Sequence, residues 1–242
     1  MLKSQLAPGC SSRTPPGGLA SSPLSVYTDV MKLLGTPLSP YAARVMIAAR
    51  AKGMELAVDE ADGWPGSATL RAVSPIGKIP VLVDGDIAIP ESEIILGYLD
   101  DCVPNPPLFP GDARQRANTR LMVRLMDTYS TPSFAPFLPS AEPEARSEAL
   151  RRIGQALGYI DHFRLDGEFA SGEEFSAADC AWIPFFHYFE TLQPAFGVLD
   201  QVRRYPRLDR WWGRARATPL GEFARGVIDE AVAKMFAKQR GE

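Results

Sequence analysis

Two helix starts in this sequence carry side chains that could hold and activate a small polar ligand. Glu91 and Ser92 stand where a 3.6-residue apolar pattern begins, directly after two short apolar runs joined by an Asp-Gly turn. Backbone N–H groups at a helix start have no partner within the helix and favour anions. These donors, the Ser92 hydroxyl and the Glu91 carboxylate would suit a ligand end bearing a carboxylate and an ammonium group. Such residues are also common in a first helical turn for structural reasons, so that interpretation stays open.

The second helix start is at Ser39, which precedes Pro40 as an N-cap serine often does. The Ser39 hydroxyl could also donate a hydrogen bond to a bound anion, worth about 1.5 to 3 kcal/mol, and the helix N-terminus adds about 0.3 to 1 kcal/mol. Since one pKa unit corresponds to about 1.36 kcal/mol, both effects together would lower the pKa of a bound acidic group by roughly one to three units. On the residues alone, a simple cap is the favoured interpretation.

The elements that position these helix starts follow from the apolar patterning. We expect short strands at residues 31–35 and 55–60, a hairpin of residues 79–83 and 87–89, and helices at residues 40–52, 68–73 and 93–101. Residues 104–111 contain four prolines and are typical of a stiff linker. Beyond it only helical patterns remain, at residues 113–128, 143–163, 177–190 and 208–217 and in a final stretch to residue 238. The sequence therefore predicts an α/β domain followed by an all-α domain.

Four short motifs follow one another along the chain. They read Thr-Pro-Leu-Ser-Pro-Tyr-Ala-Ala-Arg-Val at residues 36–45, Ser-Pro-Ile-Gly-Lys-Ile-Pro-Val-Leu at 74–82 with Asp-Gly and Glu-Ser after it, Phe-Ser-Ala-Ala-Asp at 175–179, and Tyr-Pro-Arg-Leu at 205–208. In this order they resemble the cytosolic glutathione transferases, in particular serine-type members. The third motif is also a capping box with a preceding apolar residue, which we interpret as structural.

The resemblance covers roughly residues 26 to 220 and implies a thioredoxin-like first domain. Together with the Ser-, Pro- and Gly-rich composition of the N-terminal residues, the resemblance predicts four segments. These are a disordered leader at residues 1–24, a glutathione-binding domain at 25–103, the proline-rich linker at 104–111, and an all-helical electrophile-binding domain at 112–242.

The resemblance also implies which residue is catalytic. In serine-type members the catalytic hydroxyl stands five positions before the Arg of an Arg-Val pair, as Ser39 does before Arg44. Ser39 is therefore expected to ionise the thiol of glutathione, the co-substrate, so that the thiolate can attack an electrophile. Tyr41 remains a lesser candidate for that role and is expected to form a wall of the electrophile site.

Glutathione binding is implied at the same motifs. Glu91 and Ser92 would hold the γ-glutamyl end, and the backbone of Ile79 would pair with the cysteinyl part through a cis bond to Pro80, since cis costs little only before proline. Lys78 could reach the glycyl carboxylate. Many serine-type members carry a basic residue in the preceding loop, and this chain departs from them with Trp-Pro-Gly-Ser at residues 64–67.

Two aromatic residues, Tyr129 and Phe134, flank a break in the first predicted helix of the second domain. Clefts between domains often bind small apolar ligands, so we expect these residues to line the site for a small apolar electrophile, although such rings are more often core. The predicted helices at 93–99 and 113–128 carry more apolar surface than one small domain can cover. This surface and the resemblance predict a homodimer.

Composition excludes several classes of partner. The net charge is only -3, with 26 basic residues dispersed among 29 acidic ones, so no footprint for nucleic acid is present. No apolar run approaches the roughly 20 residues needed to span a membrane. The three cysteines lack the spacing of a metal site, and no metal is expected. Residues 1–24 lack the apolar core of a signal peptide, and a cytoplasmic location is expected.

The sequence thus predicts a glutathione transferase that conjugates small apolar electrophiles. Two alternatives stay open. A glutathione-dependent aryl-ether-cleaving lyase or dehalogenase would use the same thiolate, because Ser-Pro-Tyr also occurs in some bacterial aryl-ether-cleaving relatives. A non-catalytic scaffold with the same fold would have lost the activity, and the missing basic residue near 64–67 makes this alternative credible.

Overall fold

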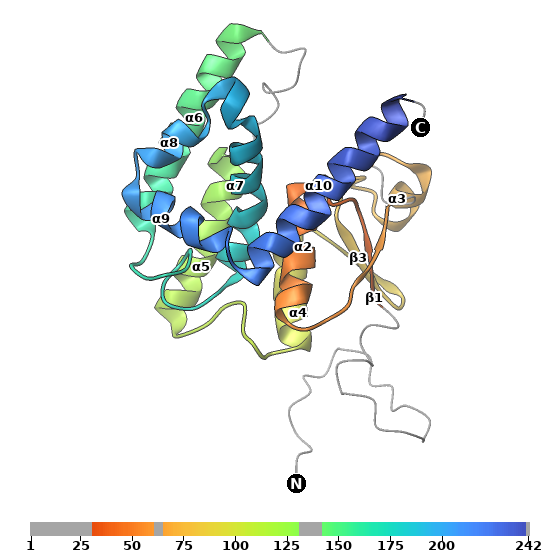
Figure 1. Ribbon diagram of the computed structural model, residues 1–242. Coiled ribbons are helices and arrows are strands. Elements are labelled where there is room, and N and C mark those ends of the chain that lie inside the picture. Colours follow the sequence, from red (N-terminus) through yellow and green to blue (C-terminus); the bar gives the residue numbers. More distant parts are fainter. Residues whose placement is uncertain (1–30, 61–64, 131–141, 241–242) are drawn as a thin grey trace. The chain divides into compact units, whose positions relative to one another are not determined.

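The computed structural model describes residues 31–60, 65–130 and 142–240. The described residues form one sheet with the strand order β2-β1-β3-β4. Its two central strands, β1 and β3, are labelled in Figure 1. The strands are β1 (Met31–Leu34), β2 (Ala57–Asp59), β3 (Val81–Asp84) and β4 (Ile87–Pro90). β1 pairs in parallel with β2 and antiparallel with β3, and β3 pairs antiparallel with β4. The hairpin predicted around the Asp-Gly turn is therefore present, with its first strand beginning after Pro80.

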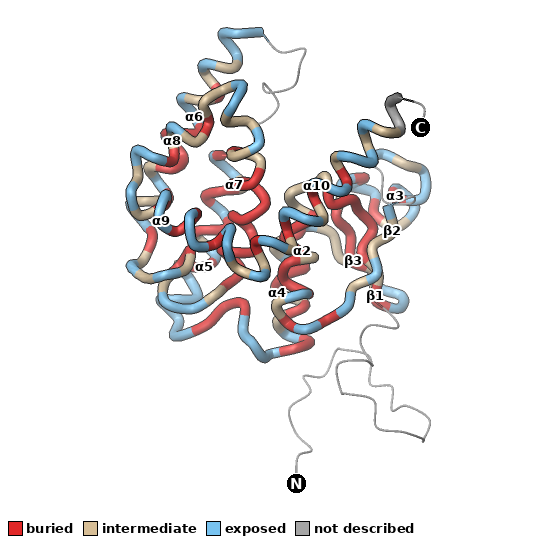
Figure 2. Tube along the Cα trace, viewed as in Figure 1, coloured by how far each residue is buried: buried red, intermediate tan, exposed pale blue. Residues whose placement is uncertain are grey.

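Three helices accompany this sheet: α2 (Pro40–Ala51), α3 (Ala68–Val73) and α4 (Ser92–Cys102). α2 packs against α4, and α4 contacts β3 and β4. The central strands β1 and β3 are mostly buried while the outer strands are more exposed, as the red and blue segments of Figure 2 show. The core contains apolar side chains from both layers, namely Leu33, Leu34, Ile47, Leu82, Ile95, Leu96 and Leu99.

The remaining helices are α5 (Ala113–Leu125), a π-helical turn η1 (Met126–Ser130), α6 (Pro143–Phe163), α7 (Ala177–Phe196), α8 (Leu199–Arg203), α9 (Pro206–Ala215) and α10 (Pro219–Arg240). α7 is the central element of this group because its first half is buried on all sides. Its Trp182 meets the Trp211 ring edge-on with centroids 5.1 Å apart, and Phe186 lies 4.9 Å from Trp211. This aromatic core joins α7 to α9.

Contacts divide the chain into two compact units. Unit 1 comprises the chain up to Leu108 together with Val227 onward, and unit 2 comprises Phe109–Gly226. The division falls within the proline-rich stretch at 104–111, and α10 begins in unit 2 and continues in unit 1. The predicted thioredoxin-like and all-helical fold classes are confirmed; the four-segment division stays a prediction.

The capping box predicted at 176–179 is present at the start of α7 and does more than cap. Besides Ser176, the Asp179 carboxylate accepts hydrogen bonds from Ala170 N (2.9 Å) and Trp211 Nε1 (2.9 Å). Burial raises the pKa of Asp179 to about 6, although these hydrogen bonds act in the opposite direction. Asp179 therefore joins α7 to α9 and to the segment before α7.

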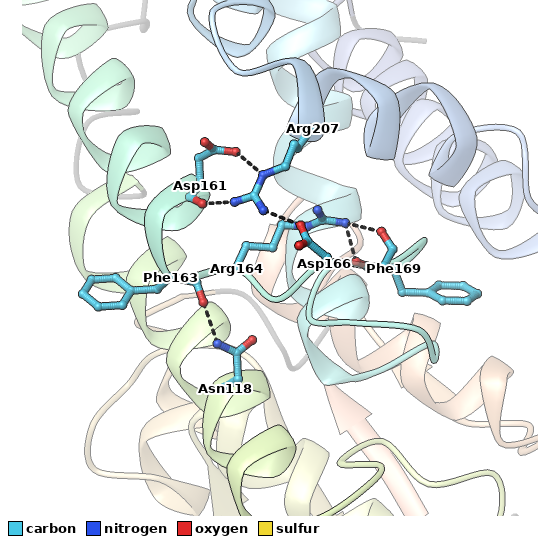
Figure 3. A network of polar contacts seen from close by, with 8 residues as sticks. Asn118, Asp161, Phe163, Arg164, Asp166, Phe169 and Arg207 are labelled. Carbon is cyan, nitrogen blue, oxygen red and sulfur yellow. Dashed lines mark hydrogen bonds and ion pairs between the residues drawn. The ribbon is translucent and has the colours of Figure 1, made fainter.

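Two arginines also hold the segment between α6 and α7 (Figure 3). Arg164 Nη2 donates to the carbonyls of Gly167 (2.8 Å) and Phe169 (2.7 Å). Arg207 on α9 forms ion pairs with Asp161 (3.1 Å) and Asp166 (2.6 Å). The chain between α6 and α7 is thus fixed although it forms no helix.

Several boundaries differ from those expected. The helix predicted at 113–128 ends at Leu125 and continues as the π-helical turn. α7 extends past the predicted end at 190 to Phe196 and stops at Gly197, whose φ of 65° suits glycine. α8 was not predicted, because five residues are too few to establish a period.

Candidate functional site

The strand register brings the predicted site segments to one end of the sheet. Val81 at the start of β3 pairs with Leu34 at the end of β1 and with Pro90 at the end of β4. The chain that follows β1, the chain that precedes β3 and the chain that follows β4 therefore meet at this end. A Cβ placed on Gly35 would lie 3.2 Å from the Ala42 Cβ and 3.7 Å from the Pro80 Cα, so glycine allows this close approach.

Ser39 is the N-cap of α2, as predicted. Its hydroxyl oxygen accepts a long hydrogen bond of 3.4 Å from Ala42 N, and its own N–H donates to Thr36 O at 2.9 Å. The side chain is half-buried. The hydroxyl hydrogen has no acceptor within the described part of the chain, so capping leaves Ser39 able to donate to a ligand.

Glu91 and Ser92 open α4. Glu91 has φ 69° and ψ 107°, a strained conformation for a residue with a side chain, and it makes no side-chain cap hydrogen bond. Its exposed carboxylate has no partner among the described residues. The Glu91 side chain therefore does not cap α4. As a result, the N–H groups in the first turn of α4 have no side-chain cap.

Ser92 is buried and bonded to a residue that the sequence analysis did not identify as part of the site. Arg44 on α2 is fully buried, and its Nη1 donates to Ser92 Oγ at 3.3 Å. The same guanidinium lies 5.0 Å from the ring centre of Tyr41. The signal was present, since Arg44 interrupts an otherwise apolar face of the predicted helix. Arg44 thus connects the two helix starts.

The Ile79-Pro80 peptide bond is cis, as the resemblance implied. Ile79 is half-buried and precedes β3, and its backbone N–H and C=O have no partner among the residues described here. An extended ligand segment could pair with these groups as a strand would.

Lys78, which was predicted to reach the glycyl carboxylate of glutathione, is exposed and forms no ion pair within the described ranges. A second cation lies close to it. A Cβ on Gly77 would be 3.4 Å from the guanidinium carbon of Arg71 on α3, so the Arg71 head lies beside Gly77. Ser67 from the atypical 64–67 stretch caps α3 through Leu70 N at 3.1 Å, and Trp64 is outside the described residues. Arg71 is therefore a second candidate cation at this position, one that the sequence alone did not indicate.

Of the three residues predicted to line the electrophile site, Tyr129 and Phe134 belong to the second predicted domain, and their outcomes differ. Phe134 lies outside the described residues. Tyr129 on η1 is exposed and meets Tyr159 of α6 edge-on at 5.4 Å. Both border a cavity of about 240 Å³ within unit 2, lined also by Thr128, Arg151, Arg152, Gln155 and Ala156. The electrophile role of Tyr129 stays a prediction.

Within residues 31–60, 65–130 and 142–240, none of the helices is both long and apolar enough to span a membrane. The same residues include no group of three or more His, Cys, Asp or Glu side chains that could hold a metal ion.

Comparison with known families gives two matches. Residues 33–107 match the N-terminal domain model of glutathione S-transferases, and residues 143–214 match the C-terminal domain model. A probable glutathione S-transferase from Glycine max is 30% identical over 195 residues, which are 78% of this chain and 84% of the relative. A stringent starvation protein A homolog from Histophilus somni is 29% identical over 171 residues, 69% of this chain and 79% of the relative.

Solved structures of the same family have a similar fold. The Tau class glutathione S-transferase from mango, Mangifera indica, superposes with a TM-score of 0.72 and 26% identity, covering 88% of this chain and 99% of that one. A rice glutathione S-transferase solved in complex with glutathione gives a TM-score of 0.70 and 26% identity, covering 84% and 95%.

Proposed function

Because the chain belongs to the glutathione S-transferase family, we propose that it binds glutathione at the sheet end of unit 1 and ionises the thiol beside Ser39. The enzyme is a transferase with glutathione as co-substrate, and its acceptors are small apolar electrophiles. The observation that carries this proposal is the strand register, which brings Ser39, the cis Ile79-Pro80 bond and Glu91-Ser92 to one sheet end.

The γ-glutamyl end binds at the start of α4. The free Glu91 carboxylate pairs with the ligand ammonium group, and the uncapped N–H groups of the first turn bind its carboxylate. Arg44 donates to Ser92 Oγ, so the Ser92 hydrogen points elsewhere and donates to that carboxylate. Arg44 acts as a positioning residue for Ser92.

The rest of glutathione extends along the sheet end. The unpaired backbone groups of Ile79 bind the cysteinyl segment through two strand-like hydrogen bonds, which places its thiol toward the N-terminus of α2. Lys78 and Arg71 supply the positive charge for the glycyl carboxylate, in place of the basic residue absent from 64–67.

The chemistry is thiolate attack. The bound thiol loses its proton to solvent, and the Ser39 hydroxyl and the N-terminus of α2 stabilise the resulting anion. The sulfur electron pair forms a C–S bond with the electrophilic carbon, and the leaving group departs with the electrons of the bond that breaks. Ser39 remains unchanged and serves the next turnover.

Isothermal titration with glutathione tests binding, and a panel of aryl halides and aryl ethers tests the reaction. We expect glutathione binding and conjugation of an aryl halide with release of halide. Cleavage of aryl ethers alone would identify the lyase alternative.

We place the enzyme in the cytoplasm as a homodimer, as the sequence predicts.

The absence of a basic residue at 64–67 favours one second candidate, a non-catalytic member of the fold. A scaffold would keep the Asp179 network and the aromatic core of unit 2 while glutathione binding is lost. Titration therefore separates the two: absence of binding with an intact fold supports the scaffold, and binding with turnover supports the transferase.

A further inference from the structure

A separate cavity of about 130 Å³ lies within unit 2, where α7, α9 and the segment between α6 and α7 meet. Its volume is close to that of an engineered protein cavity of about 150 Å³ that binds benzene. It is lined by Glu168, Phe169, Phe175, Asp179, Ile183, Trp211, Arg214, Ala215 and Thr218. None of these residues belongs to the proposed glutathione site, so a ligand in this cavity would be distinct from glutathione.

The walls suit a single aromatic ring. Phe169, Phe175, Ile183 and Trp211 are apolar, and the two phenylalanine rings meet edge-on at 6.2 Å. Hydrogen bonds hold the walls in place. Trp211 Nε1 donates to Asp179 at 2.9 Å, and Arg164 donates to the Phe169 carbonyl. The Phe169 ring extends away from the guanidinium groups (Figure 3). A preformed apolar cavity binds a ring with little loss of side-chain entropy.

The rim is polar and exposed. Arg214 Nη2 donates to the Glu168 carbonyl at 2.9 Å, and its other N–H groups have no partner in the described chain. The Glu168 carboxylate likewise has no hydrogen-bond partner among the described residues. The Thr218 hydroxyl already has two hydrogen-bond partners, since it donates to Ala215 O at 2.7 Å and accepts from Gly221 N at 3.1 Å. The rim therefore offers one free donor group and one free acceptor group.

We propose that this cavity binds a neutral monocyclic phenol. The ring occupies the apolar walls, and the hydroxyl accepts from Arg214 and donates to the Glu168 carboxylate. The lining contains two carboxyl groups, those of Glu168 and Asp179, and one guanidinium group, that of Arg214. The carboxyl groups therefore disfavour binding of an anionic ring such as benzoate. Toluene fills the same volume but leaves both rim groups without a ligand partner.

The experiment is ¹⁹F NMR titration of 4-fluorophenol into the full chain without glutathione, so it does not depend on the proposed transferase activity. We expect saturable binding with a Kd of about 1 mM, a reasonable value for so small a ligand. Unlabelled phenol should displace the probe, and toluene or benzoate should compete at least fivefold less well. Absence of saturable binding, or equal competition by all three, overturns the proposal.

Paired variants locate the site. Ala215→Leu fills the cavity and should weaken binding at least tenfold, whereas Ala217→Leu, on the exposed chain after α9, should leave it within twofold. Arg214→Gln should weaken binding threefold to tenfold, and Arg210→Gln, exposed on the same helix, should not. Arg214 is exposed, so its variant keeps the test decisive if Ala215→Leu unfolds. Equal effects within both pairs place the ligand elsewhere and contradict the assignment.

Discussion

Glu91 differs from every other described residue with a side chain, because only it combines a positive φ with a helix N-cap position. Strain of this kind persists where the surroundings enforce it, often at ligand sites. Glu91→Gln keeps the shape and removes the charge opposite the ligand ammonium group. We expect glutathione binding to weaken tenfold to a hundredfold, which corresponds to about 1.5 to 3 kcal/mol, as measured by isothermal titration.

Asp86→Asn is the matched control for this prediction, since Asp86 is an exposed carboxylate in the β3–β4 turn of the same unit. It should leave the affinity unchanged. The melting temperature of Glu91→Gln should stay near that of the wild type, because Glu91 makes no cap hydrogen bond. Unchanged affinity together with a large drop in melting temperature would mean that Glu91 is structural.

At the scale of elements, one buried lysine joins three parts of unit 1. Lys52, at the end of α2, donates to Asp100 Oδ1 on α4 (2.7 Å) and to the carbonyls of Val103 (2.6 Å) and Pro106 (2.8 Å). Asp100 Oδ1 also accepts from Leu108 N at 2.7 Å. The side chain of Lys52 is fully buried, so Lys52→Met should leave Asp100 and two carbonyls without their donor.

We expect Lys52→Met to lower the free energy of unfolding by about 3 to 5 kcal/mol in urea titrations. The control is Lys32→Met, which removes an ion pair with Asp59 whose lysine is 44% exposed. That change should cost about 1 kcal/mol or less. Similar losses in the two variants would show that the Lys52 contacts contribute no more than a surface pair.

The Asp179 network predicts a pH dependence of unit 2. Because the pKa is about 6 in the folded chain and 3.8 in the unfolded one, the folded state holds a proton between these values that the unfolded state has lost. The free energy of unfolding therefore falls by about 1.4 kcal/mol per pH unit as the pH rises from 4 to 6, and this contribution is flat above pH 6. Denaturant titrations from pH 4.5 to 7.5 should show this slope in the wild type and not in Asp179→Asn. Equal slopes would place the Asp179 pKa near its ordinary value.

At the scale of the whole molecule, exposed apolar side chains bear on the oligomeric state. Unit 1 exposes Ile87 on β4 and Ile94 on α4, which are 43% and 58% exposed. Because β4 and α4 contact each other, exposed apolar side chains on these two elements favour association with a second copy. We expect sedimentation equilibrium at micromolar concentration to give a dimer, and Ile94→Glu to shift it toward the monomer. A single species of 26.4 kDa in the wild type would rule out this interface.

The sequence predicted those features that depend on local signals. The helices at 68–73 and 143–163 have the bounds expected from caps and periodicity, and the fold class followed from the change of pattern after the prolines. The roles of Arg44, Lys52 and Arg71 could not be predicted, because each depends on a partner brought close by tertiary folding. The Asp179 capping box was predicted, but not its bond to Trp211 on α9.

The central claim, that Ser39 stabilises the thiolate, is tested most directly by the ultraviolet absorbance of glutathione thiolate, titrated against pH on the wild type and on Ser39→Ala. Ser67→Ala, which removes the cap of α3, is the control. We expect Ser39→Ala to raise the pKa of the bound thiol by roughly one to two units, to leave glutathione affinity nearly unchanged, and to lower turnover at neutral pH by one to two orders of magnitude. Ser67→Ala should titrate as the wild type does. Identical titration curves for the wild type and Ser39→Ala would show that Ser39 only caps α2.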